Sequence, residues 1–317
     1  MPRSLIRKNP SNFKTLSLFV EATPEGLSYQ SIGMPLNFAQ TLQKRQQVNV
    51  ADTERFGLEL ANLGVSVRLT LEWQGRDYWV LVRQRRQDRG DVVLKLISGY
   101  VPAHDINLPL HTAIQEVAEE CLLETPEGWL SGRFNDTWLP APYINALHYR
   151  EAFPFRLTPN SGAARPVRCA SQPLLERPRA YVHLPTASLQ LIYDLRMEVP
   201  KEAKSLSLFH VEERLEGDQL VARLDRKRPD LYLIPLTEGL PCPELYTLRK
   251  GMLHAASTRG LHLAESFAPQ EGWLVRDERI RWKDWLKQQG LNVPTQESKL
   301  KRLTGKAREL FRKVVKQ

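Results

Sequence analysis

The sequence predicts an α+β domain in which a helix packs on a sheet. Three segments with β-strand character, 65–73, 78–86 and 92–99, follow one another across short polar turns. The third segment ends at a glycine that precedes an amphipathic helical segment. A run of strands followed by a helix is typical of this fold class. The 317 residues suffice for one large domain or two modest ones with an apolar core.

The chain before these strands is expected to contribute one short helix. Residues 1–50 contain only brief apolar runs and are expected to form an irregular N-terminal extension. The following segment, 51–64, predicts a helix, with Asp52 or Thr53 at its N-cap and Gly64 just after its last turn.

The three strands are supported by their residue patterns. "VSVRLTLEW" alternates apolar and polar residues, and "YWVLVRQRR" resumes this pattern after the turn "QGRD". "VVLKLISG" follows the turn "QDRGD" and ends at Gly99.

The helical segment after Gly99 carries three glutamates on one face. It is expected to begin near Asn107, a favourable N-cap, with Pro109 in its first turn, and to end near Thr125. Apolar residues recur at helical spacing on its buried side, at Leu110, Ile114, Val117 and Cys121. Off this stripe lie three like charges within one turn, Glu116, Glu119 and Glu120.

These glutamates predict a metal site. Carboxylates three and four residues apart on a helix repel one another by a few tenths of a kcal/mol per pair, roughly. Converging carboxylates can hold Mg²⁺ or Mn²⁺, hard cations that prefer oxygen ligands, and a bound cation removes the repulsion. A metal held in this way can also bind the phosphate oxygens of a substrate and activate a water molecule.

From Gly99 through "QEVAEECLL" the sequence resembles the Nudix box, G-x5-E-x7-R-E-U-x-E-E-x-G-U, in which U is aliphatic. The resemblance implies an α/β/α sandwich with a mixed sheet, in which a strand ends at the glycine and the helix brings glutamates to a divalent metal. It implies hydrolysis of a phosphoanhydride in a nucleoside diphosphate linked to another group. Glu116, Glu119 and Glu120 would hold Mg²⁺ or Mn²⁺, and Glu119, Glu120 or a carboxylate further along would deprotonate the attacking water.

Several positions depart from the family's pattern. Gln115 stands where the family has Arg, and Asn107 stands where it has the loop Glu. Gly99 lies two residues too far upstream, which implies an insertion in the loop, and Leu122 replaces the glycine that ends the helix. The family's Arg and Glu help to hold the loop against the helix, so their loss bears on catalytic efficiency. The three metal-site carboxylates are all present.

Substrate contacts are expected at the end of the second strand and after the helix. Arg83 and Arg85 are placed to meet phosphates, and a solvated hairpin rim explains them equally well. Residues 126–185 are rich in proline and lack periodicity, which predicts a long insertion that selects the substrate. Within it, Tyr143 and Tyr149 are candidates to stack on a nucleobase or to pin the insertion to the body of the protein.

The remainder of the chain is expected to complete the sheet and then become helical. Strands are expected at 189–199, 206–215, 219–225 and 231–236. A helix is expected over 241–256, and 298–317 has the pattern of a basic amphipathic helix. The expected organisation is an extension over 1–50, a Nudix-like domain over 51–240 and a C-terminal helical region over 241–317.

Charge and cysteine content bear on partners and setting. Residues 281–317 hold 11 Lys/Arg against 3 Asp/Glu, a net charge of +8 out of +9 for the chain. This basic tail either contacts an anionic partner, such as nucleic acid or a lipid surface, or packs its apolar side on its own domain. The three scattered cysteines favour neither a disulfide framework nor a zinc knuckle and indicate a reducing, cytoplasmic setting. No segment has the roughly 20 apolar residues that a transmembrane helix needs.

Three functions are therefore open to this sequence. The first is a Nudix-type hydrolase that acts on a nucleotide-type substrate with Mg²⁺ or Mn²⁺. The second is the same fold with an impaired box, which senses a nucleotide or docks on another macromolecule. The third is a nucleic-acid-associated protein in which the basic tail makes the contact.

Overall fold

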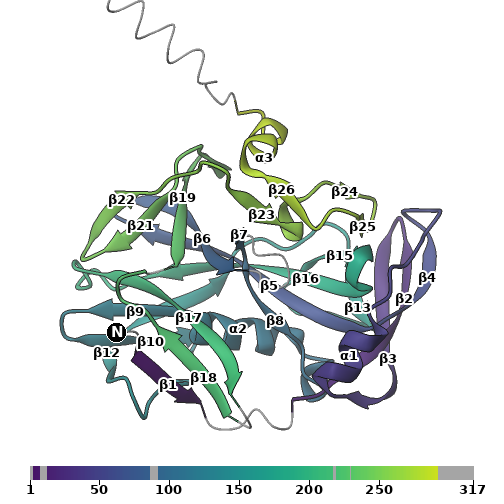
Figure 1. The fold of residues 1–317 in the computed structure, drawn as a ribbon, viewed down its shortest axis with the longest axis horizontal. Helices are drawn as coiled ribbons and strands as arrows, with labels where there is room; N and C mark the ends of the chain where they lie inside the picture. The colour runs from purple at the N-terminus through teal and green to yellow at the C-terminus, as the bar shows by residue number, and fades with distance from the viewer. Residues whose placement is uncertain (1–2, 8–12, 86–91, 217–218, 229, 292–317) are drawn as a thin grey trace, which may run out of the picture.

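The computed structural model describes residues 3–7, 13–85, 92–216, 219–228 and 230–291, and consists mostly of β-strands (Figure 1). One large, curled, mixed sheet and a separate five-stranded sheet account for the strands in this part of the chain. Helix α2 (Pro109–Glu120) packs against the large sheet. This architecture is compatible with the expected α+β class, with more strand and less helix than the sequence predicts.

Strand β5 (Asn62–Trp73) is the centre of the large sheet. One of its edges pairs in parallel with β16 (Ser188–Glu198) along the whole strand. Its other edge pairs antiparallel with β8 (Ile97–Tyr100) near its start and with β6 (Arg76–Arg85) near its end. Val67 thus lies between Tyr193 and Ile97. Because nearly every β5 residue is buried, the sheet is covered on both faces at this strand.

The large sheet continues outward from these central strands. Two branches leave β6. One runs through β7 (Val92–Lys95) to β23 (His262–Ala264) and β26 (Arg279–Arg281). The other begins at β19 (Leu231–Thr237), which pairs with β20 (Leu240–Pro241) and with β21 (Tyr246–Arg249), and β21 pairs with β22 (Met252–Ala255). From β16 the sheet passes through β15 (Arg179–His183), β25 (Leu274–Val275), β24 (Gln270–Glu271), β12 (Tyr149–Pro159), β10 (Gly128–Phe134), β11 (Thr137–Trp138) and β9 (Cys121–Thr125). Beyond β9 lie β17 (Ser207–Glu216), β18 (Gln219–Leu224) and β1 (Arg3–Arg7).

The smaller sheet packs beside the start of β5 (Figure 1). Its strand order is β14 (Gln172–Pro173), β13 (Val167–Cys169), β3 (Gly26–Leu36), β2 (Thr15–Thr23) and β4 (Phe56–Leu60). Helix α1 (Phe38–Lys44) follows β3 and begins at a capping box, in which Asn37 and Gln40 exchange side-chain to backbone hydrogen bonds of 2.9 Å. Buried residues of both sheets, such as Leu18 and Val65, belong to one hydrophobic core.

Helix α2 fits the large sheet through the apolar stripe that the sequence predicts. Of the four predicted residues, Leu110, Val117 and Cys121 are buried in the main core and Ile114 is partly buried, while Ala113, which is not among them, is also buried. Burying a Leu or Val side chain contributes about 1.5 to 3 kcal/mol, which fixes the rotation of the helix about its axis. The helix begins one residue after Leu108, with Pro109 in its first turn as expected. It does not continue to Thr125, because residues 121–125 form β9, which pairs with β17.

The expected irregular extension and the expected helix over 51–64 are both wrong. Residues 15–36 form the long β2–β3 hairpin, and α1 follows it. Within 51–64 the chain forms β4 and enters β5, so that Gly64 lies inside a strand. The reason is visible in "FGLEL", where alternate residues face the core and β4 pairs with β2.

The expected structureless insertion over 126–185 is also wrong, because this segment supplies six strands, β10 to β15. Three of its prolines stand at places where a strand tolerates a missing N–H group; one of them, Pro154, lies in β12 where the pairing with β10 is irregular. Pro159 is the last residue of β12, and Pro173 lies in the short edge strand β14. Proline enrichment therefore marks strand ends and edges in this segment.

Residues 241–256 form a β-hairpin where a helix is expected. Strands β21 and β22 are joined by Lys250 and Gly251, whose φ angles of +48° and +77° suit a type I′ turn. The described part of the C-terminal region contains one α-helix, α3 (Trp282–Gln288), and one 3₁₀ turn, Glu265–Phe267, and is otherwise largely β-structure. The expected amphipathic helix over 298–317 lies outside the described residues.

The other expected strands are confirmed within a few residues, as β5, β6, β16, β17, β18 and β19. The expected strand over 92–99 is divided at Leu96 into β7 and β8. No helix in the described segments has the length and apolar character required to cross a membrane.

Candidate functional site

The connection from β8 to α2 is held by buried polar contacts. The carboxylate of Asp105, which is buried, accepts hydrogen bonds of 3.1 Å from Thr112 Oγ1 and from His111 Nδ1 in the first turn of α2. The hydroxyl of Tyr29 donates to the carbonyl of Ile106 at 2.8 Å. These bonds fix the start of the helix relative to both sheets, and thereby the positions of the glutamates further along it.

Glu116 lies directly against the glycine that precedes the helix. A Cβ atom built on Gly99 would come within 1.9 Å of Glu116 Oε1 and 2.2 Å of its carboxyl carbon. Only a residue without a side chain therefore leaves room for this carboxylate in its present place. The structure thus brings together Gly99 and Glu116, both of which the sequence singles out.

Glu120 reaches the residue next to that glycine. The backbone N–H of Ser98 donates to Glu120 Oε2 at 3.4 Å, and Lys95 Nζ lies 3.6 Å from Glu120 Oε1. Lys95 also donates to Ser98 Oγ at 3.1 Å. Because Glu116 and Glu120 contact adjacent residues, their carboxylates converge on one dipeptide at the edge of β8. We call Lys95, Ser98, Gly99, Glu116 and Glu120 the carboxylate site.

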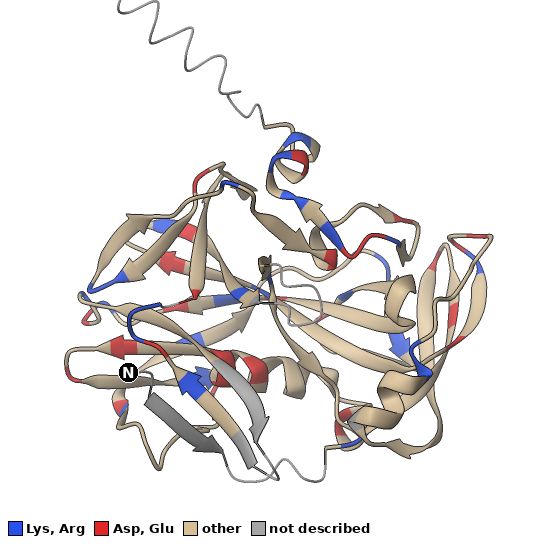
Figure 2. Cartoon of the chain, viewed as in Figure 1, with Lys and Arg blue, Asp and Glu red and all other residues tan. Residues whose placement is uncertain are grey.

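Glu119 is placed differently from the other two glutamates. It is 5% exposed, and its backbone carbonyl accepts a hydrogen bond of 3.4 Å from the hydroxyl of Tyr143. The acidic residues of α2 gather toward the end of the helix (Figure 2). Among the described residues, no group of three or more His, Cys, Asp or Glu side chains is arranged to hold a metal ion. The three glutamates therefore do not form one three-ligand cluster in this conformation.

His210 on β17 borders the carboxylate site. Its Nδ1 lies 3.2 Å from the carbonyl of Glu120, and because a carbonyl oxygen only accepts, Nδ1 carries the proton. Burial lowers the pKa of His210, the charge of nearby Glu120 opposes this shift, and Lys95 adds to it. His210 thus fixes the last residue of α2 and adds an imidazole to this region.

The expected phosphate-binding arginines lie at the end of β6. Arg83 pairs with Asp230, with Nη1 3.3 Å from Oδ1, and its backbone N–H donates to the carbonyl of Asp230 at 2.9 Å. Arg85 ends β6, and its side chain lies outside the described part. Arg83 therefore has a structural partner, and it lies on the strand beside β7, which carries Lys95.

The two tyrosines expected to stack on a base are built into the fold. Tyr143 is 0% exposed, so neither face of its ring is open to a ligand, which argues against the stacking role. Tyr149 is partly buried and packs against the same core cluster as Tyr143. Burial raises the pKa of Tyr149. Both residues fit the alternative in which these aromatic rings hold the segment to the body of the protein.

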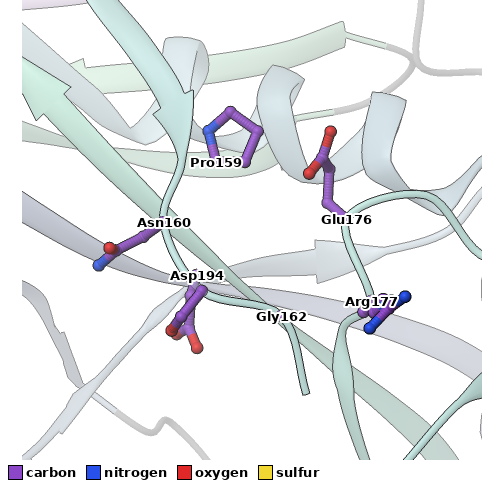
Figure 3. A pocket seen from close by; sticks show the side chains of 7 residues that line it. Pro159, Asn160, Gly162, Glu176, Arg177 and Asp194 are labelled. Atoms are coloured by element: carbon purple, nitrogen blue, oxygen red, sulfur yellow. The ribbon is translucent and has the colours of Figure 1, made fainter. Parts of the chain in front are cut away.

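A separate cavity of about 220 Å³ lies between the segment after β12 and the turn before β15 (Figure 3). It is lined by Pro159, Asn160, Ser161, Gly162, Glu176, Arg177 and Asp194. The buried carboxylate of Asp194 accepts two hydrogen bonds from Arg68, at 2.5 and 2.6 Å, and lies 3.6 Å from Arg179. No residue of α2 lines this cavity, so it is distinct from the carboxylate site.

Sequence reasoning missed Lys95, Ser98 and His210. A local signal existed for the first two, because "KLIS" immediately precedes Gly99 and places a lysine on the strand that leads to the helix. No local signal existed for His210, which is brought to Glu120 by the pairing of β17 with β9. Comparisons with protein-family models, curated proteins and solved structures found no match to this chain.

Proposed function

We propose that this protein is a metal-dependent hydrolase of Nudix type that cleaves a phosphoanhydride in a nucleoside diphosphate linked to another group. The observation that supports the proposal is the convergence of Glu116 and Glu120 on Ser98 and Gly99, beside the ammonium group of Lys95. The resemblance of the sequence from Gly99 through the helix to the Nudix box gives this geometry its chemical interpretation.

Two carboxylates are sufficient for the metal that we propose. Mg²⁺ is reluctant to lose water and is commonly bound through one or two carboxylates together with substrate phosphate oxygens. Glu116 and Glu120 would supply the protein ligands, and the substrate and water would complete the coordination. Lys95 Nζ lies 3.6 Å from Glu120 Oε1, and a divalent cation bound by the two carboxylates would add its own positive charge to the site.

The proposed reaction is an in-line attack of water on phosphorus. The metal would polarise the phosphate oxygens and lower the pKa of a bound water. The water oxygen forms a bond to phosphorus, the bridging P–O bond breaks, and the proton passes to a carboxylate. Glu119 and Glu120 are the candidate bases, and Lys95 would neutralise charge on the leaving phosphate.

A nucleotide-binding module without turnover is the second candidate. It is favoured by the ion pair between Lys95 and Glu120, which already compensates one of the carboxylates that a catalytic metal requires. In that case the carboxylate site would bind a nucleotide through a metal or through Lys95 and release it unchanged.

One experiment separates these candidates. A panel of nucleoside diphosphate derivatives is incubated with the full chain and Mg²⁺ or Mn²⁺, alongside Glu116→Gln, Glu119→Gln and Glu120→Gln. We expect turnover by the wild-type chain and a loss of at least about 100-fold in Glu120→Gln, in line with the removal of a group that acts in the transition state. Glu59→Gln, on an exposed residue of β4, is the matched control and should keep full activity. Binding without turnover of any substrate would establish the second candidate and remove the first.

A further inference from the structure

Six basic residues from three segments form one surface, which we call the basic surface: Lys204, Arg226, Lys227, Arg228, Arg249 and Lys250. Hydrogen bonds join the segments. Arg249 Nη2 donates to the carbonyl of Lys227, which ties the β21–β22 turn to the turn between β18 and β19. The backbone N–H groups of Lys250 and Gly251 donate, at 2.8 Å each, to Ser207 Oγ and to the carbonyl of Leu206. Figure 2 shows the basic residues at these turns.

The positive charge of this surface is poorly compensated. Lys204, Lys227, Arg228 and Lys250 are exposed, and within the described part of the chain none of them has an ion-pair partner. Arg226 does pair, with Nη2 2.5 Å from Glu124 Oε1. The same segments also contain Glu202, Asp225 and Asp230, so the cations outnumber the nearby anions. An excess of exposed positive charge creates a field that attracts a polyanion.

The basic surface lies close to the carboxylate site because of strand register. His210 is opposite Cys121 in β9, and Val211 is opposite Leu224, the last residue of β18. Continuing this register places Asp225, where the basic turn begins, opposite His210. Two interstrand spacings, or roughly 10 Å, therefore separate the start of the basic turn from the end of α2.

We propose that the phosphoanhydride cleaved at the carboxylate site is the end of a single-stranded oligonucleotide whose backbone phosphates bind the basic surface. This inference rests on the proposed function. A flexible polyanion can follow the three turns and still bring its end to Glu120. The phospholipids of an anionic bilayer, such as phosphatidylserine, contain phosphoesters and no phosphoanhydride, so they offer no bond for the proposed reaction. The observations therefore favour nucleic acid over lipid.

Binding is tested first with an oligonucleotide that lacks the terminal phosphoanhydride and therefore cannot react. The affinity of the full chain for a fluorescein-labelled 5′-hydroxyl oligonucleotide of mixed sequence is measured by fluorescence anisotropy between about 50 and 200 mM KCl. The triple variant Lys227→Ala/Arg228→Ala/Lys250→Ala should make binding less sensitive to salt. The slope of log K against log[salt] should become less negative by about 2, since each contact with a single strand contributes roughly −0.7.

A matched variant controls for net charge. Arg168→Ala/Arg259→Ala/Lys283→Ala removes three exposed basic residues that lie in other segments, and it should leave the slope unchanged. An equal fall in slope in both triple variants would overturn the proposal, because the whole molecule's charge would then explain the binding. Binding of phosphatidylserine vesicles that is lost in the first triple variant, with no binding of the oligonucleotide, would overturn it in favour of a lipid partner.

Turnover then separates this inference from the proposed function. The first triple variant should raise KM for a 5′-triphosphate oligonucleotide by at least about tenfold, as expected from a loss of ground-state binding, and leave KM for ATP unchanged. Turnover of ATP with no preference for the oligonucleotide would sustain the proposed function and overturn the inference. Absence of turnover of either compound would overturn the proposed function and the substrate assignment together, whereas the salt slope would still identify the surface that binds the strand.

Discussion

The carboxylate of Glu116 lies on the backbone of Gly99, so closely that a methyl group at residue 99 would come within 1.9 Å of Oε1. The obstructed atoms belong to the flexible end of the glutamate, so a side chain at residue 99 would displace the carboxylate and leave the backbone in place. Gly99 has no left-handed φ that would strain another residue. A substitution at Gly99 can therefore move the carboxylate of Glu116 with little effect on the stability of the fold.

The substitution Gly99→Ala should weaken binding of Mn²⁺ by about tenfold or more, because a displacement of about 1 Å at a functional group is already costly. The melting temperature should change by only a few degrees, roughly the effect of 1 kcal/mol. Electron paramagnetic resonance of free Mn²⁺ gives the affinity, and thermal unfolding gives the stability.

The control for this prediction is Gly57→Ala on β4. A Cβ atom there meets only the ring of Phe19, at 3.3 Å, far from the helix in sequence. It should not alter the affinity for Mn²⁺. Unchanged Mn²⁺ binding in Gly99→Ala would show that Glu116 is not a ligand.

The parts of the fold that the sequence predicts are those set by local patterns. Strands β5, β6 and β16 have continuous β-type residues, and the apolar stripe of α2 is complete within its own segment. The apolar residues of α2 recur at helical spacing, and the side of the helix that they form is the side that is buried. One part that failed depends on a partner distant in sequence, in 51–64, where pairing with β2 overrides an apparent helix start. The β2–β3 and β21–β22 hairpins are local, so distance in sequence does not account for their absence from the predicted elements.

The same distinction applies to the candidate site. The closeness of Gly99 to Glu116 follows from a strand, a short connection and a helix, and these are consecutive in the chain. The approach of His210 to Glu120 depends on a β-pairing 90 residues apart in sequence, which no local pattern contains. Tyr143 is a stacking candidate only if its segment is an open loop; it lies instead in the connection between β11 and β12, where its ring packs in a buried cluster.

Removal of Lys95 should have opposite effects on metal and substrate. In Lys95→Met the ammonium group no longer competes for Glu120 Oε1, from which it is 3.6 Å distant, so Mn²⁺ should bind several-fold more tightly. The KM for a diphosphate substrate should rise, because the phosphates lose a cation. In EDTA the melting temperature should fall, and Mn²⁺ should restore it, since ligand binding stabilises the folded state.

Lys283→Met, at an exposed residue of α3, is the control and should change none of the three quantities. Weaker Mn²⁺ binding in Lys95→Met would contradict the proposal that Lys95 and the metal compete for the same carboxylate.

Acid should destabilise the protein through His210. Burial lowers its pKa below the ordinary value of 6.5, and the unfolded chain therefore binds more protons than the folded one as the pH falls below that value. Stability contributed by this residue is constant at higher pH and declines as the pH falls through 6.5 toward the lowered pKa. Urea unfolding at several pH values between about 5 and 8 measures the decline.

His210→Gln should flatten this pH dependence, because the substituted side chain does not titrate. His254→Gln, at an exposed position on β22, should retain it. The same steep decline in both variants would assign the acid sensitivity to other groups.

The ion pair between Arg68 and Asp194 should matter for stability far more than the surface pairs do. The side chains are 26% and 5% exposed, and they lie opposite each other on β5 and β16. Asp194→Asn leaves Arg68 and the nearby Arg179 without their carboxylate, and burial with the charge of Arg68 already lowers the pKa of Arg179. Loss of one partner of a buried pair is expected to cost about 3 kcal/mol of unfolding free energy.

A double-mutant cycle distinguishes an unpaired charge from lost packing. Arg68→Met/Asp194→Leu removes both charges and should recover most of the loss, because apolar residues of similar size often replace a buried pair without cost. Removal of the exposed pair Arg276 and Glu271, 3.1 Å apart, should change the unfolding free energy by less than about 1 kcal/mol. Equal losses for Asp194→Asn and for the double variant would show that the packing of these side chains, and not their charge balance, stabilises the junction of β5 with β16.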